Sequence, residues 1–137
     1  MSQNPYLSRI QNQPALIEEG HGKWLEACLA VVHSRADELE KADHSSTDFW
    51  ESGMEWARPY IVENGVLQIP VKGVLLNDFP YALGSWATGY EYIWQAVRRG
   101  VDDSEVKGIA LVINSGGGMV SGNWDLVDRI ASQRGTK

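Results

Sequence analysis

The chain has 137 residues, of which 43% are hydrophobic and 22% are charged, and its formal net charge is −6. This length fits one domain or part of a larger one, and the composition is that of a globular protein. Lysine and arginine form no cluster in the sequence, which argues against nucleic acid or an anionic membrane as the main partner. No run approaches the roughly 18 apolar residues of a transmembrane helix, and the first residues lack the pattern of a secretory signal. Because the single cysteine, Cys28, can form no internal disulfide, we expect a cytoplasmic setting.

Residues 1–57 are expected to form an N-terminal helical arm. Residues 1–20 contain two prolines and read as an irregular segment. From residue 23 to about residue 41, apolar residues recur at helical spacing, which predicts an amphipathic helix. Residues 49–58 could add a short helix that Pro59 would end.

Residues 58–137 are expected to form a second unit that begins with a β-hairpin. The sequence "YIVENGVLQIPVKGVLL" predicts two strands joined at Asn64 and Gly65, because both residues tolerate the positive φ angles of a type I′ turn. Pro70 cannot donate a hydrogen bond to a strand neighbour, so it marks a sheet edge or a bulge.

The remaining elements alternate between helix and strand. Thr88 and Glu91 have the spacing of a capping box that opens a helix, and Gly100 is placed to end that helix. The run "VKGIALVIN" predicts a strand buried on both faces. After it, Asn123 can cap a helix whose apolar face includes Trp124. The order strand, helix, strand, helix predicts an α/β fold with a largely parallel sheet.

Between that strand and that helix lies "SGGG", residues 115–118, which we expect to form a turn. Four interpretations are open: a tight structural crossover, a phosphate cradle, an oxyanion hole, and a crotonase-like acyl-CoA site suggested by "MVSGNWDL". The Walker pattern is absent, and only two glycines of the dinucleotide pattern are met, which weakens the phosphate interpretation. An oxyanion hole needs backbone N–H groups that a substrate can approach closely, and glycine permits this approach.

Six tryptophans are many for this length, and they indicate either core packing or a partner interface. His21, His33 and His44 have no metal-ligand spacing, so no metal site and no cofactor are expected.

The segments "GVLQIPVKGVL" and "TGYEYIWQAVRRGVDDSEVKGIALVINSGGGMVSGNWDLVDRIASQRGTK" resemble the signal peptide peptidase A (protease IV) family of serine peptidases, and in particular its phage branch. The resemblance covers residues 60–137, and the N-terminal arm is similar to the leading segment of phage members. It implies a ClpP/crotonase-like fold with repeated ββα units and a homo-oligomeric assembly. The substrates that it implies are scaffold or capsid proteins, which are cleaved during head maturation in the procapsid or host cytoplasm. The crotonase interpretation is disfavoured because that superfamily's "NRPE.NAL" segment is missing.

The family's "SPGG" motif corresponds to "SGGG" here, with Gly116 in place of the proline. The resemblance makes the backbone of Gly117 and Gly118 the oxyanion hole, and it makes Gly116, Met119 and Val120 the lining of the bound peptide. Removing the proline loosens the turn, because proline fixes φ.

The family's serine nucleophile and lysine base correspond to positions beyond Lys137. With neither residue, residues 1–137 alone would be inactive, and the nucleophile's acyl-enzyme chemistry would need a longer chain. The alternative is a non-catalytic structural or interaction protein of capsid assembly.

Overall fold

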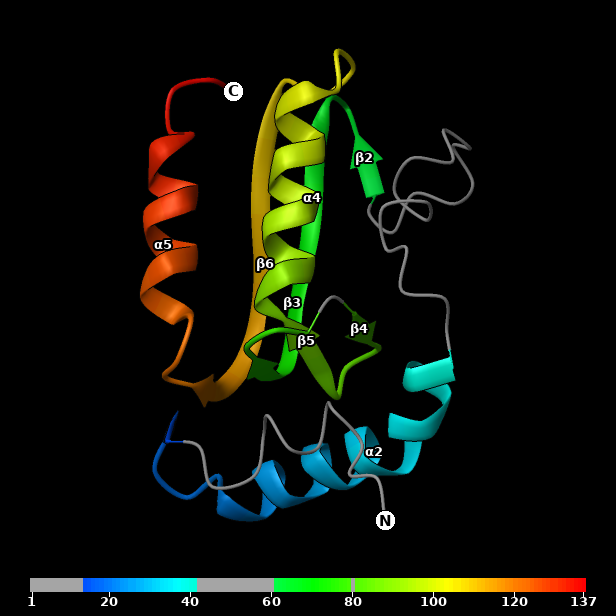
Figure 1. Ribbon diagram of the computed structural model, residues 1–137. Coiled ribbons are helices and arrows are strands. Elements are labelled where there is room, and N and C mark those ends of the chain that lie inside the picture. Colours follow the sequence, from blue (N-terminus) through cyan, green and yellow to red (C-terminus); the bar gives the residue numbers. More distant parts are fainter. Residues whose placement is uncertain (1–13, 42–60, 80) are drawn as a thin grey trace.

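The computed structural model describes residues 14–41, 61–79 and 81–137 (Figure 1). The predicted helix over residues 49–58 lies outside these described residues. The elements in chain order are β1 (Ala15–Ile17), α2 (Gly22–Lys41), β2 (Ile61–Glu63), β3 (Val66–Leu76), β4 (Ala82–Leu83), β5 (Ala87–Gly89), α4 (Tyr90–Asp102), β6 (Gly108–Met119) and α5 (Asn123–Ser132).

All the strands belong to one mixed sheet with the order β1-β6-β3-β5-β4, and β2 also pairs with β3. β3 and β6 run parallel along most of their length, and α4 forms the crossover between them. This pair confirms the predicted strand–helix–strand unit. β1 pairs with β6 in the antiparallel direction, as β2 does with β3 and β4 with β5.

The predicted hairpin is confirmed. Asn64 and Gly65 have φ angles of 53° and 80° and join β2 to β3. Pro70 lies where β3 pairs with β6 only, between the ends of its pairings with β2 and β5. Both the backbone N–H and the C=O of Lys72 bond to the hydroxyl of Thr88, away from β6. Pro70 is two residues earlier in the strand, so its missing N–H is on the same open side and no ladder hydrogen bond is lost.

The predicted boundaries of α4 are wrong at both ends. The helix begins after Gly89 with no side-chain cap, and Thr88 belongs to β5, where its hydroxyl bonds to the backbone of Lys72. Gly100 lies inside the helix and faces β3, where a Cβ atom would come within 2.4 Å of Leu67 Cδ2. This glycine therefore permits close helix–sheet packing and does not end the helix.

The core lies between the sheet and its helices. The side chains of β3 alternate in burial, and Leu67, Ile69 and Val71 point inward as a half-buried strand requires. Figure 1 shows α4 and α5 along one face of the sheet, with α2 crossing the end where β3 and β6 finish. Cys28 and Val32 of α2 are fully buried in the same core. The division at residue 57 stays a prediction, because residues 42–60 lie outside the described residues.

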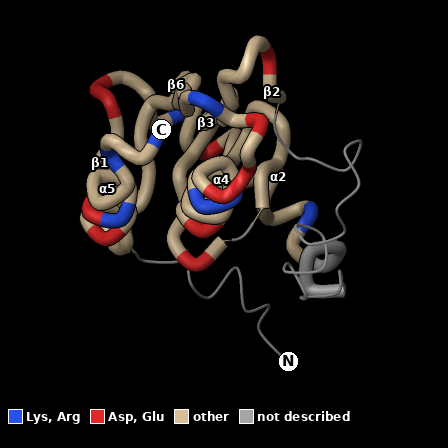
Figure 2. Tube along the Cα trace, turned by 90° about the horizontal axis from the view of Figure 1, so that it is seen from above, with Lys and Arg blue, Asp and Glu red and all other residues tan. Residues whose placement is uncertain are grey.

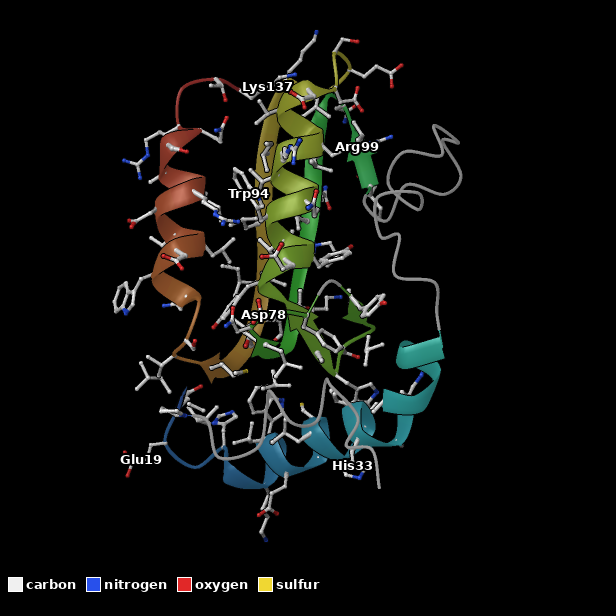
Figure 3. All side chains as sticks on the ribbon, in the orientation of Figure 1. Glu19, His33, Asp78, Trp94, Arg99 and Lys137 are labelled. Atoms are coloured by element: carbon white, nitrogen blue, oxygen red, sulfur yellow. The ribbon has the colours of Figure 1, made fainter. Side chains whose placement is uncertain are left out.

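The prediction that Asn123 caps α5 is wrong, because the capping position is Gly122, in the left-handed conformation with φ 84°. The arginine of α5 instead ties the helix to its neighbour: the Arg129 guanidinium lies 5.7 Å from the ring centre of Trp94 on α4, which faces α5 in Figure 3. Trp124 is 68% exposed. Of the two interpretations open for the tryptophans, core packing therefore does not apply to Trp124.

The strand predicted to be buried on both faces is also exposed in part. Val112 and Ile113, in the middle of β6, are 45% and 64% exposed. In Figure 2, Asp and Glu positions alternate with Lys and Arg positions along the Cα trace of the described part of the chain, and the basic positions form no continuous run there. In the same residues no helix is long and apolar enough to cross a membrane. The ClpP/crotonase-like fold stays a prediction.

Candidate functional site

The glycines at residues 116–118 lie inside a strand, so the predicted turn at "SGGG" is wrong. β6 continues through them to Met119, and the chain turns only at Ser121 and Gly122. We call residues 116–120 the glycine edge. The simple crossover interpretation does not account for these glycines, because the crossover comes after them.

Ser115 holds the glycine edge to β3. Its Oγ donates a hydrogen bond to the carbonyl of Gly73 at 2.6 Å and accepts one from the N–H of Gly117 at 3.1 Å. Gly73 lies at an irregularity in the β3–β6 register and has a φ of 75°. The amide assigned by resemblance to the oxyanion hole therefore bonds to the Ser115 hydroxyl in this structure.

The opposite side of the glycine edge pairs with the N-terminal segment. In the antiparallel register Leu16 faces Gly118 and Ile17 faces Gly117. The N–H of Glu18 donates to the carbonyl of Gly116 at 2.8 Å, and the N–H of Val120 donates to the carbonyl of Pro14 at 3.0 Å. The prediction of an irregular segment is thus wrong for residues 15–17, which form a strand on the candidate site.

Close backbone contacts on two sides explain why glycine is needed here. A Cβ atom on Gly117, whose φ is 130°, would lie 2.0 Å from the carbonyl oxygen of Leu16. One on Gly118 would lie 2.3 Å from the carbonyl oxygen of Leu75 in β3. Neither neighbour is a flexible side chain, so the edge admits no side chain at either position.

The start of α2 covers Gly116. A Cβ atom there would lie 3.0 Å from Trp24 Cζ3 and 3.3 Å from His21 Cδ2. The His21 and Trp24 rings meet edge to face with their centres 5.9 Å apart. The N-terminal arm therefore caps the candidate site.

Met119 ends the strand in a buried position. Its carbonyl accepts a hydrogen bond from the Tyr90 hydroxyl at 2.5 Å, and its Sδ accepts one from the N–H of Asn77 at 3.3 Å. Burial raises the pKa of Tyr90 to about 12, which keeps the phenol protonated as a donor. These contacts fix the end of the glycine edge to α4 and to the residue that follows β3.

A cleft of about 210 Å³ opens beyond the carboxyl ends of β3 and β6, where Asp78 lies in Figure 3. Its charged lining residues are Asp78, Glu91, Asp125 and Arg129. Three carboxylates against one guanidinium disfavour an anionic ligand. This lining argues against the phosphate cradle.

No metal or thiol site emerges in the described ranges. They hold no group of three metal-ligating side chains, and His44 lies outside them. Burial raises the pKa of the Cys28 thiol, and a backbone hydrogen bond from Val74 lowers it by less. A buried thiol held protonated is a poor nucleophile.

Sequence reasoning missed two contributors to this site, Ser115 as a backbone anchor and residues 14–18 as a pairing strand. A three-residue strand carries almost no periodic signal, so only the apolar "ALI" after Pro14 pointed to it. The assignments of Gly117 and Gly118 to an oxyanion hole, and of Gly116, Met119 and Val120 to the peptide lining, stay predictions.

Comparison with known proteins gives two phage relatives. The chain is 34% identical over 140 residues to the head-tail preconnector protein GP5 of Enterobacteria phage P21. This alignment covers 92% of the chain and 27% of that protein. It is 37% identical over 91 residues to the capsid assembly protease C of Escherichia phage lambda. That alignment covers 64% of the chain and 20% of that protein. The chain thus spans about a quarter or less of the relatives it matches. No protein-family model and no solved structure matches it. The comparisons therefore relate this chain to phage head proteins, one of which is named a protease.

Proposed function

We propose that this chain supplies the peptide-binding strand and an oxyanion donor of a serine peptidase that cleaves scaffold or capsid proteins during phage head maturation. The observation that carries the proposal is the glycine edge of β6, which binds an extended segment through backbone hydrogen bonds. Peptidases benefit from such an edge because strand addition holds a peptide extended with its carbonyl accessible. Similarity to a capsid assembly protease supports the reaction class.

The chemistry is an acyl transfer in two steps. A serine Oγ, placed by the family resemblance beyond Lys137, would attack the scissile carbonyl while a lysine amine takes its proton. The carbonyl electron pair moves to the oxygen, and the backbone N–H of Gly117 would donate to that oxyanion. The N–H of Gly118 is in phase with that of Val120 and would instead face the bound peptide strand. Collapse expels the amine, which takes the proton from the lysine, and water then hydrolyses the acyl-enzyme.

Ser115 would tune this step through Gly117. The N–H of Gly117 bonds to Ser115 Oγ, and it would have to exchange this acceptor for the oxyanion. Ser115 would stay in place during the exchange because its hydroxyl also donates to Gly73. A charged oxygen is the stronger acceptor, so the exchange would favour the tetrahedral intermediate.

A fluorophosphonate probe tests the proposal on the intact protein from its native source. We expect a species heavier than 15.2 kDa that gains one adduct, since the predicted nucleophile lies beyond residue 137. Gly117→Ala keeps the backbone N–H, but its Cβ atom would lie 2.0 Å from the Leu16 carbonyl oxygen, so the amide must shift, and we expect labelling to slow by about 10²-fold, as when an oxyanion donor is lost. Gly108→Ala, on the same strand with no atom within 4 Å of the added Cβ, is the matched control. Absence of an adduct on a protein that holds both serine and lysine would refute the mechanism.

The proposal includes a homo-oligomer, and the exposed Val112 and Ile113 of β6 offer an apolar surface for it. Light scattering after size-exclusion chromatography measures the assembly. A monomer at micromolar concentration would remove this part of the proposal.

A second candidate function is a non-catalytic structural or interaction role in capsid assembly. The exposed tryptophans favour it, because Trp86 is 46% and Trp124 68% exposed, and such side chains often anchor protein interfaces. The intact mass decides between the two: a species at 15.2 kDa without an adduct would favour the structural role.

A further inference from the structure

The contacts that hold β1 on the glycine edge are made mainly by backbone. Two hydrogen bonds flank the strand, from Glu18 N–H to the Gly116 carbonyl and from Val120 N–H to the Pro14 carbonyl. The register between them pairs residues 15–17 with residues 119–117. Any extended peptide can make such contacts, because they do not depend on side chains.

The side chains of β1 add little to this attachment. Leu16 is 67% exposed and Ala15 is exposed as well, while Ile17 is half-buried. A three-residue strand with so little apolar burial belongs to the parts of a fold that open at low cost. β1 is therefore a weakly held occupant of the edge.

The neighbouring helix can stay in place when β1 leaves. Gly20, with a φ of 85°, lies in the short link between β1 and α2, and a Cβ atom there would meet nothing within 4 Å. Beyond the link, Cys28 and Val32 anchor α2 in the core with no exposed surface. The release of β1 from β6 can therefore be confined to residues 14–20.

We propose that residues 14–18 are an internal competitor for the peptide-binding edge, and that an incoming extended peptide must displace them in antiparallel register with residues 116–120. This inference rests on the proposed function only in taking the incoming peptide to be a substrate. The displacement itself requires no catalytic residue. The tethered strand competes at an effective concentration on the order of millimolar, so it lowers the apparent affinity for peptides in trans.

Proline variants of β1 test the competition. The N–H of residue 16 is in phase with that of Glu18 and faces β6, whereas the N–H of residue 15 faces away. Leu16→Pro therefore removes a backbone donor to β6. Ala15→Pro places proline at the adjacent position and removes no donor to β6, so it is the matched control. Both side chains are exposed, so neither variant empties the core.

The probe is a fluorescein-labelled peptide with the sequence of residues 12–20, NQPALIEEG, and binding to the intact protein is followed by fluorescence anisotropy. We expect Leu16→Pro to bind it about tenfold or more tightly than the wild type, since the competent fraction rises. Ala15→Pro should match the wild type. The same peptide with proline in place of leucine should not bind Leu16→Pro. Equal affinity of the two variants would overturn the proposal.

Hydrogen exchange on the unmodified protein gives an independent readout. Excess unlabelled peptide should speed exchange at the amide of Glu18, which loses its acceptor on Gly116, while Leu67 and Ile69 in the core stay protected. An unchanged Glu18 amide at saturating peptide would show binding elsewhere and would overturn the proposal. Neither experiment needs a nucleophile, so peptide displacement without a fluorophosphonate adduct would refute the peptidase and leave this inference standing.

Discussion

The two halves of β6 differ in burial, and the difference is the opposite of what their side chains predict. The aliphatic half, residues 108–114, pairs with β3 alone among the described strands, and it leaves Val112 and Ile113 exposed. The glycine half, residues 116–119, pairs with β3 and β1, and the rings of Trp24 and His21 lie against Gly116. Strands can approach most closely where side chains are missing. In this sheet, the backbone is therefore most enclosed at the residues with the least apolar surface.

The strongest test of this contrast is a methyl group added to the glycine half. Gly118→Ala places a Cβ atom 2.3 Å from the backbone oxygen of Leu75, and we expect a loss of about 3 kcal/mol in the free energy of unfolding. Gly108→Ala in the other half should change it by less than about 0.5 kcal/mol. Urea denaturation measures both. Equal effects would mean that the two halves are equally open.

Ser115 offers a test of the junction between the halves. Ser115→Ala removes the acceptor of the Gly117 N–H and the donor to the Gly73 carbonyl, both part-buried. We expect a loss of about 2 kcal/mol, because backbone groups are left without partners. Ser132→Ala, which removes an exposed hydroxyl bonded within its own helix, should be nearly neutral. A neutral Ser115→Ala would mean that water replaces both contacts.

Tyr90 tests the far end of the glycine half. Tyr90→Phe removes the hydrogen bond to the Met119 carbonyl, and we expect a loss of about 1 kcal/mol at neutral pH. Burial raises the pKa of Tyr90, and also that of Tyr92, from 10 to about 12. The folded state thus holds these protons more tightly than the unfolded state. Their contribution to stability is complete below pH 10 and is lost as the pH rises towards 12.

The pH dependence is measured by urea denaturation at several pH values, with phenolate absorbance followed in parallel. Tyr90→Phe should lose less stability between pH 10 and 12 than the wild type does. An identical decline in both proteins would assign the alkaline sensitivity to Tyr92 or to another group.

The smallest effect is expected in the aliphatic half. Ile113→Thr keeps a β-branched side chain at a site that is 64% exposed in the single chain, so at concentrations where the protein is monomeric the free energy of unfolding should change by less than about 0.5 kcal/mol. The same change at the fully buried Ile69 is the positive control and should cost several times more. A loss of about 2 kcal/mol at Ile113 in the monomer would show that another segment of the chain covers this half, whereas a loss that appears only at higher protein concentration would support the proposed homo-oligomer.

Local patterns in the sequence predicted local structure. Asn64 and Gly65 specified the hairpin, and the spacing of Cys28 and Val32 specified the buried face of α2. The run of glycines marked residues 115–118 as a candidate site and the resemblance assigned their roles, but their form as a strand was missed. Glycine has low strand propensity, so strand structure there depends on pairing with β3 and β1. The β1 pairing could not be predicted, because Ile17 and Gly117 lie a hundred positions apart.

That separation has a consequence for how the molecule assembles. Local elements such as the hairpin can form early, whereas pairing β1 with β6 closes a loop that spans most of the chain. On the ribosome, residues 14–18 leave the exit tunnel long before their partner strand is synthesised. β1 can therefore pair only after β6 has been made, so the most distant contact of the described sheet is also the one that must wait longest for its partner.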